Sequence, residues 1–178
     1  MTTGHVFIAT SLDGYVARPD HGLDWLMKQP VVDGDDGGFS AFFDTVDGLI
    51  MGAGSFRTVA GFGQWPYTKP VIVMSRSMSD DDIPDELKSK VELSQLDPDA
   101  LMGSLAKRGW TRAYVDGGRL VQSFLRAGLI ADLTITQVPI LIGQGIRLFG
   151  DLDSDIDLKL ERAETLVTGM LQTTYRVL

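Results

Sequence analysis

The chain has 178 residues, no cysteine, two histidines and a formal net charge of −8. This length suits one domain with one sizeable core. The acidic total argues against a nucleic-acid-binding surface, which needs a clustered excess of Lys and Arg. The lack of cysteine excludes disulfides, thiolate metal sites and cysteine nucleophiles. Two histidines are too few for a histidine-rich metal centre, so we expect no metal.

Membrane and export segments are not expected either. No segment approaches about 18 consecutive apolar residues, and the N-terminus lacks a basic region followed by an apolar run. We therefore expect a cytoplasmic protein.

The first predicted strand covers residues 5–9 (HVFIA) and runs into the turn signal Asp13-Gly14. Residues 18–38 are then polar and rich in glycine and proline. In a compact domain, a loop of this length is more often a functional lid than a connector. Asp13 either orients a substrate and relays a proton, or only shapes the Asp-Gly turn.

Three side chains stand out in the loop of residues 18–38. Trp25, flanked by leucines, either closes over a ligand or pins the loop to the core, and we favour pinning. Asp35 and Asp36 precede a helical stripe that begins at Phe39, where the helix dipole favours acidic groups. Capping is the favoured interpretation for both, and Asp36 is the second catalytic candidate after Asp13.

Two further strands end in groups that suit phosphates. Residues 48–51 (GLIM) are followed by a glycine turn and a helix start at residues 52–55 (GAGS), with Ser55 available as a cap. Residues 71–74 (VIVM) end at Ser75-Arg76-Ser77. An arginine flanked by hydroxyls suits a phosphate monoester, although it is also what a solvated surface arginine looks like.

Residues 112–150 organise the rest of the chain. A strand at residues 113–115 ends at Asp116-Gly117-Gly118, and an apolar stripe at helical spacing follows as far as Gly128. Such a unit presents free backbone N–H groups and a positive helix end to a phosphate. A tight turn explains the glycine pair equally well. If the strands are parallel, this turn and the one at residues 52–55 bind two parts of one phosphorylated ligand.

The remaining pattern completes one α/β domain over residues 1–178. An edge strand at residues 91–93 and a helix at residues 97–108 precede residues 112–150. Strand material at residues 133–142 is interrupted by Pro139, and alternating segments at residues 158–162 and 170–178 follow. We predict a three-layer fold with a mixed, mainly parallel sheet, helices on both faces and antiparallel C-terminal strands.

Five motifs resemble, in this order, those of the dihydrofolate reductase-like superfamily. Within it, the chain is most similar to the group allied to the reductase domain of the bacterial riboflavin-biosynthesis deaminase/reductase. The motifs are residues 9–15 (ATSLDGY), 51–56 (MGAGSF), 73–76 (VMSR), 115–118 (VDGG) and 139–149 (PILIGQGIRLF). The resemblance implies a dihydrofolate reductase-like fold, NADPH as cofactor, and hydride transfer from C4 of the nicotinamide.

The resemblance also implies cofactor contacts, which follow the ends of the strands. They are the nicotinamide pocket at Ala9, Asp13 and Gly14, the phosphate turn at Gly52, Gly54 and Ser55, the 2′-phosphate contact at Ser75 and Arg76, and the pyrophosphate turn at Gly117, Gly118, Leu120 and Val121.

The sequence departs from the resemblance at two places. Relatives commonly have a basic residue at the position of Ala53, which leaves Arg76 as the clearest 2′-phosphate contact. Folate reductases carry an acidic residue on the helix after the first loop, and residues 35–39 (DDGGF) place no carboxylate on the matching helical face. Folate reduction is therefore not expected.

Three functional hypotheses follow. The first is an NADPH-dependent reductase of a small pterin-like, pyrimidine-like or other carbonyl or imine substrate, with Asp13 and Asp36 as catalytic candidates and Trp25 as a substrate contact. The second is a binding protein that keeps the dinucleotide site but catalyses nothing, and cofactor oxidation that rises with a substrate would separate the two. The third is a structural partner domain. The apolar run at residues 138–142 and the C-terminal strands predict a homodimer.

Overall fold

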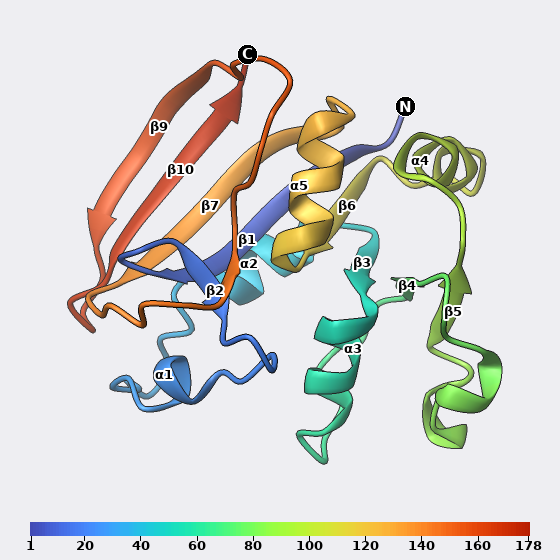
Figure 1. The fold of residues 1–178 in the computed structure, drawn as a ribbon, viewed down its shortest axis with the longest axis horizontal. Coiled ribbons are helices and arrows are strands. Elements are labelled where there is room, and N and C mark those ends of the chain that lie inside the picture. Colours follow the sequence, from blue (N-terminus) through green and yellow to red (C-terminus); the bar gives the residue numbers. More distant parts are fainter.

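The computed structural model describes all 178 residues, and eight of its strands form one sheet (Figure 1). These strands are β1 (Thr3–Ser11), β3 (Gly48–Gly52), β4 (Val71–Met74), β5 (Val91–Ser94), β6 (Arg112–Asp116), β7 (Ile130–Val138), β9 (Leu158–Thr165) and β10 (Leu171–Val177). Their spatial order is β5-β4-β3-β6-β1-β7-β10-β9. In this spatial order, neighbouring strands are parallel from β5 through β4, β3, β6 and β1 to β7. The strand β10 is antiparallel to both β7 and β9. The predicted mixed, mainly parallel sheet is confirmed.

Helices cover both faces of this sheet. They are α2 (Phe39–Asp44), α3 (Ala53–Ala60), α4 (Pro98–Lys107) and α5 (Gly118–Arg126), and a further short helix, α1 (Asp24–Met27), lies in the loop after the first strands. Ile50 of β3 packs in one core with α4 and α5, whereas its neighbours Leu49 and Met51 pack in a second core with α2 and α3. Because successive strand residues point to opposite faces, the predicted three layers are confirmed. None of the helices is long and apolar enough to cross a membrane.

Local sequence signals set the ends of the helices. The Asp97 side chain accepts a 2.8 Å hydrogen bond from the amide of Ala100, and Pro98 occupies the first turn of α4. Gly109 and Gly128 follow α4 and α5 with φ values of +90° and +66°, a left-handed conformation that ends helices. The helix predicted at residues 97–108 and the helix predicted to follow the glycine pair and end near Gly128 are therefore confirmed to within a few residues.

The segment after β7 differs from the expectation. β7 ends at Val138, and the apolar residues after Pro139 form no strand. Proline cannot donate to a strand ladder, and the Ile142 amide donates instead to the Asp13 carboxylate. The next strand, β8 (Ile146–Arg147), pairs with β2 (Tyr15–Ala17) in a separate two-stranded sheet. This small sheet lies against the start of α5.

Candidate active site

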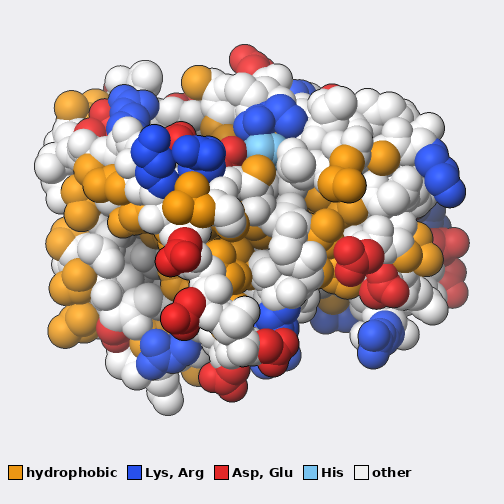
Figure 2. All heavy atoms as spheres, turned by 90° about the horizontal axis from the view of Figure 1, so that it is seen from above, with side chains coloured by type: hydrophobic (Ala, Val, Ile, Leu, Met, Phe, Trp, Pro, Cys, Tyr) orange, Lys and Arg blue, Asp and Glu red, His pale blue; other side chains and the backbone are white.

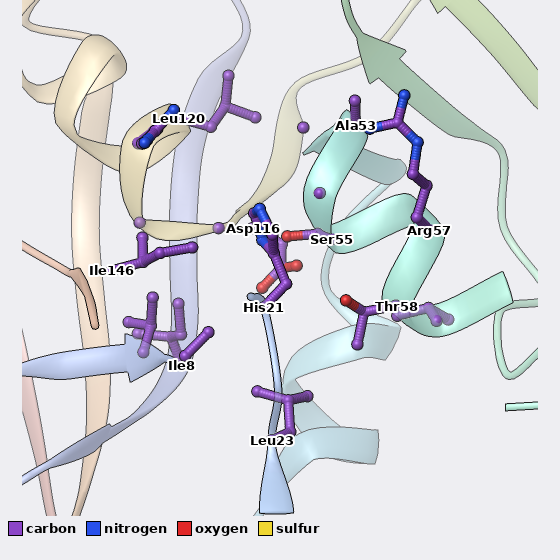
Figure 3. A pocket seen from close by; sticks show the side chains of 18 of the residues that line it. Ile8, His21, Leu23, Ala53, Ser55, Arg57, Thr58, Asp116, Leu120 and Ile146 are labelled. Carbon is purple, nitrogen blue, oxygen red and sulfur yellow. The ribbon is translucent and has the colours of Figure 1, made fainter. Parts of the chain in front are cut away.

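A cavity of about 660 Å³ opens at the carboxyl ends of β1, β3 and β6 (Figure 3). Its walls come from the end of β1, the loop after β2, the first turns of α3 and α5, and β8. The carboxyl edge of parallel strands is the usual ligand position in open α/β sheets. Fifteen of the 26 lining residues are hydrophobic, so the cavity suits ring systems held by a few polar groups.

The turn from β3 into α3 forms one wall of this cavity. Gly52, Gly54 and Ser55 all line it. The backbone of Gly52 is extended, and a Cβ built on it would meet no atom within 4 Å. The first amides of a helix have no partner within the helix and carry the positive end of its dipole. The predicted phosphate turn therefore lies on the cavity wall.

The turn from β6 into α5 faces it, with Gly117, Gly118 and Leu120 on the wall. Gly117 has φ +100°, which disfavours any side chain. A Cβ at Gly118 would lie 2.3 Å from the carbonyl oxygen of Arg147. The glycine pair is thus both a steric requirement of the turn and part of the cavity. Val121 was also expected to contact the cofactor. Its side chain instead points from α5 into the core, is fully buried there and does not line the cavity.

Asp116 is a cavity residue that the sequence analysis missed. Burial raises the pKa of its carboxyl group, although hydrogen bonds from Ser55 and Tyr114 oppose the rise. The Tyr114 hydroxyl donates to the carbonyl of Phe7 at 2.9 Å and lies 3.3 Å from Oδ1 of Asp116. A carboxyl group in this setting retains its proton more readily than an ordinary aspartate. Its position directly before the glycine pair was the available sequence signal.

His21 is a second missed cavity residue. It lies at the tip of a turn in which the amide of Arg18 donates to the carbonyl of Gly22 and the amide of His21 donates to the carbonyl of Arg18. Figure 3 shows its side chain near the centre of the cavity, close to Asp116 and Ser55. The sequence signal was the turn sequence at residues 19–22 (PDHG).

Two arginines on the wall, Arg57 of α3 and Arg119 of α5, were also missed. Both are solvent-exposed and lie within the first two turns of their helices. They place positive charge beside the two helix starts. Their positions shortly after a glycine turn were the only signal in the sequence.

Ser75 and Arg76 follow β4 just outside the wall, two residues or fewer from Met74, which lines the cavity. The Ser75 hydroxyl accepts hydrogen bonds from the amides of Ser77 and Met78 at 3.2 and 3.1 Å. Arg76 is exposed. Ser75 therefore shapes the turn that presents Arg76 to solvent near one end of the cavity.

At the end of β1, only one of the three expected contacts lies on the wall, and that is Ala9. Gly14 turns the chain with φ +84° and accepts a 3.1 Å hydrogen bond from the amide of Leu148. The Asp13 carboxylate accepts hydrogen bonds from the amides of Ile142 and Gly143, the latter at 2.8 Å. A hydrogen bond from Ser11 makes the largest contribution to lowering the pKa of Asp13. Asp13 therefore fixes the loop, and it does not line the cavity.

Asp36 and Trp25 also lie away from the cavity. Asp36 accepts hydrogen bonds from the amides of Gly38 and Ser40 at 2.9 and 2.8 Å, so it caps α2, and bonds from Ser40 lower its pKa. Trp25 has no exposed surface and packs with Val138 and Met170. Asp36 therefore caps its helix and Trp25 holds its loop to the core, which are the roles favoured from the sequence. Neither side chain lines the cavity, so nothing in the structure supports a catalytic role for Asp36 or a substrate contact for Trp25.

Comparison with known proteins agrees with this geometry. Residues 3–172 match the model of the RibD C-terminal domain. YwjB of Bacillus subtilis (strain 168) is 30% identical over 161 residues, which cover 88% of this chain and 87% of YwjB. A solved structure of a protein from Shewanella sp. PV-4 assigned to riboflavin biosynthesis is 39% identical, with a TM-score of 0.92 and coverage of 99% of both chains.

A more distant structure shares the fold. The diaminohydroxyphosphoribosylaminopyrimidine deaminase/5-amino-6-(5-phosphoribosylamino)uracil reductase of Thermotoga maritima has a TM-score of 0.76 at 12% identity, over 99% of this chain and 57% of that one. The resemblance inferred from the five motifs is thereby confirmed, and the chain belongs to the RibD C-terminal domain family, with its dihydrofolate reductase-like fold.

Proposed function

We propose that the protein is an NADPH-dependent reductase that transfers a hydride to a small pyrimidine-like substrate. The observation that carries this proposal is the meeting of two glycine turns in one cavity. The starts of α3 and α5 follow the adjacent parallel strands β3 and β6, and Gly52, Gly54, Gly117 and Gly118 all line the same space. Two helix N-termini that converge in this way suit the two phosphates of a dinucleotide.

The chain's residues fit such a cofactor. The cavity volume of about 660 Å³ lies within the usual range for cofactor and ligand sites. The open space in front of Gly52 lets a phosphate approach the backbone, since no side chain fills it. Arg57 and Arg119 add positive charge beside the helix starts. On the opposite side, Ile8 and Ala9 offer an apolar wall for the nicotinamide.

The chemistry divides between cofactor and protein. Bound NADPH would supply the hydride from C4 of its nicotinamide ring. The apolar side chains of Ile8 and Ile146 on the cavity wall would limit the access of water to the transferred hydride. Asp116, whose pKa is raised by burial, retains a proton more readily than an ordinary aspartate, which suits a group that donates a hydrogen bond to a ring nitrogen or carbonyl of the substrate. Asp116 thus replaces Asp13 and Asp36 as the candidate acid.

The proposal of a pyrimidine-like substrate is based on the aromatic side chains that line the cavity and on a relative of the chain. The rings of Phe7, Tyr67 and Tyr114 line the cavity and suit a planar heterocycle. The Thermotoga maritima relative is a reductase of 5-amino-6-(5-phosphoribosylamino)uracil, a pyrimidine. We therefore choose this compound as the first substrate to test.

Calorimetric titration with NADPH and NADH tests the cofactor, and nicotinamide absorbance with the uracil compound tests the reaction. We expect tight NADPH binding and oxidation that rises with substrate. Binding without oxidation across a panel of pyrimidines and pterins would instead favour a non-catalytic dinucleotide-binding protein. If neither nucleotide binds, the proposal is wrong.

Arg76 is proposed as the 2′-phosphate contact. It is an exposed cation beyond the Met74 end of the cavity. Arg76→Ala should weaken NADPH binding about tenfold and leave NADH binding unchanged, because only NADPH carries the extra phosphate. Lys107→Ala removes an exposed cation in the last turn of α4, outside the cavity wall, and serves as the control. Equal losses for NADPH and NADH in Arg76→Ala would refute this role.

We also propose that the chain forms a homodimer through β9, the sheet edge that is bonded only to β10. Leu158 and Leu160 on this strand are 41% and 52% exposed. Hydrophobic side chains gather along the left edge of Figure 2, the side on which β9 lies in Figure 1. An exposed edge of this kind presents unpaired backbone groups that are open to pairing with a second chain.

Sedimentation at micromolar concentration tests this pairing. The wild type should be a dimer and Leu160→Lys a monomer, while Leu96→Lys, at an exposed position beside the opposite edge, should stay dimeric. A wild type that sediments as a monomer contradicts the proposal. The cytoplasmic location stays a prediction from the sequence.

A further inference from the structure

The position of His21 between the two halves of the cavity points to a role in binding. In Figure 3 its side chain lies beside Ser55 and Asp116, with apolar side chains of β1 and β8 on one side and α3 on the other. A dinucleotide carries its diphosphate between its two nucleoside halves. The centre of the cavity is therefore where a diphosphate would lie if the cofactor spans both sides.

The turn that carries His21 is held in place by several interactions. The Arg18 guanidinium forms two hydrogen bonds with the Asp24 carboxylate, at 2.5 and 2.8 Å. The Asp20 carboxylate accepts a 3.0 Å bond from the amide of Gly22, and two backbone bonds close the turn. His21 is thus presented to the cavity by a structured tip, although its own side chain is exposed.

The imidazole of His21 lies directly against the first turn of α3. A Cβ built on Gly54 would lie 2.2 Å from Cε1 and 2.5 Å from Nδ1 of this ring. The ring has no hydrogen-bond or ion-pair partner in the protein, in contrast to His5, whose two ring nitrogens contact Thr3 and Asp132. Its donor capacity is therefore available to a ligand at the start of α3.

The backbone at position 21 adds an independent observation. His21 has φ +68° and is the one non-glycine residue in the chain with a positive φ. This conformation costs a residue with a Cβ roughly 1–2 kcal/mol relative to glycine. Strain of this kind is concentrated at functional sites. The backbone alone would favour glycine here, so what position 21 gains from histidine is the imidazole itself.

We infer that His21 is a binding residue for the diphosphate of the cofactor, and this inference rests on the proposed NADPH site. A phosphate that accepts hydrogen bonds from the first amides of α3 shares the space in front of Gly54 with the His21 ring. An imidazole N–H then donates to a phosphate oxygen from the side opposite the helix. The turn of residues 18–22 forms the third side of the anion site, with α3 and α5 as the other two.

The variant His21→Gly tests this inference, because glycine accepts the positive φ and removes only the ring. We expect an unchanged or higher melting temperature. The affinities for NADPH, NADH and ADP-ribose should fall alike, by about tenfold, since all three carry the diphosphate and lose one charge-assisted hydrogen bond. Lys28→Ala, which removes a cation from the same loop outside the cavity wall, should leave all three affinities unchanged.

The outcomes separate this inference from the proposed function. If the His21→Gly variant binds all three ligands as tightly as the wild type does, the inference about His21 is wrong. The proposed function still holds in that case, provided that the wild type binds NADPH. A loss confined to NADPH also overturns the inference, because it would place His21 at the 2′-phosphate. If wild type binds inorganic diphosphate in a His21-dependent way but no dinucleotide, the anion site stands and the proposed cofactor is wrong. Binding of neither ligand overturns both.

Discussion

Replacement of Gly118 by alanine tests the packing of the glycine pair against β8. The added Cβ would lie 2.3 Å from the carbonyl oxygen of Arg147 and 3.0 Å from Cγ2 of Val16. Ordinary contact begins at 3.4 Å, so the β8 backbone has to move by about 1 Å. The same carbonyl accepts a 2.9 Å hydrogen bond from the Gln122 side chain, which the movement would weaken.

The expected cost follows from these contacts. Overpacking of a closed site costs about 1–3 kcal/mol, and a weakened hydrogen bond adds up to about 1 kcal/mol. We therefore expect Gly118→Ala to lower the free energy of unfolding by about 1–4 kcal/mol. For a chain of this length, the melting temperature would fall by about 2–16 °C.

Thermal unfolding followed by circular dichroism measures this change, with Gly103→Ala as the matched control. Gly103 lies inside α4, and a Cβ built on it would meet nothing within 4 Å. Alanine there should raise the free energy of unfolding by about 0.5–1 kcal/mol, because it has the higher helix propensity. An unchanged melting temperature in Gly118→Ala would show that the β8 backbone moves freely and that the steric argument is wrong.

Three further predictions concern the cavity and the loop beside it. Gly52→Val adds a side chain to open space at an extended residue. We expect the NADPH affinity measured by calorimetry to fall at least about tenfold, while the melting temperature shifts by no more than about 4 °C. An unaltered affinity would count against the phosphate turn. Because burial raises the pKa of Asp116, the folded protein binds this proton more tightly than the unfolded chain, and the stability that it contributes is lost as pH rises from the ordinary value of 3.8 through the raised one. Asp116→Asn should remove that decline from the free energy of unfolding measured in urea at a series of pH values, and an identical pH dependence in both proteins would contradict it. Trp25→Ala should cost about 3–5 kcal/mol of stability, whereas a rise in KM at unchanged stability would restore the substrate-contact role.

The sheet and its helices could be predicted because their signals are local. Residues 48–51 and 71–74 are short apolar runs that end at glycine or polar residues, and both are strands. The glycine turns at residues 52–55 and 117–118 were identified in the same way, and both lie on the cavity wall.

The features that the sequence analysis missed depend on residues far apart in the chain. β8 pairs with β2 across about 130 residues, which no local periodicity encodes. The raised pKa of Asp116 comes from burial within the folded protein, and His21 reaches the cavity because the Arg18–Asp24 pair closes its turn. The sequence offered Asp13 and Asp36 as candidate acids because it does not show what a carboxylate contacts. In the folded protein, both carboxylates accept hydrogen bonds from backbone amides.

The central position of β1 has a consequence for the order in which the chain folds. Its two neighbours are β6, where Thr3 lies opposite Arg112, and β7, where Val6 lies opposite Leu133. During synthesis on a ribosome, the first strand to emerge therefore has no partner until the chain has passed residue 112. Closing loops of this length slows folding and leaves apolar strand edges open to aggregation. A nascent chain that ends before residue 112 should therefore depend on chaperones. Its release from them should coincide with the appearance of β6.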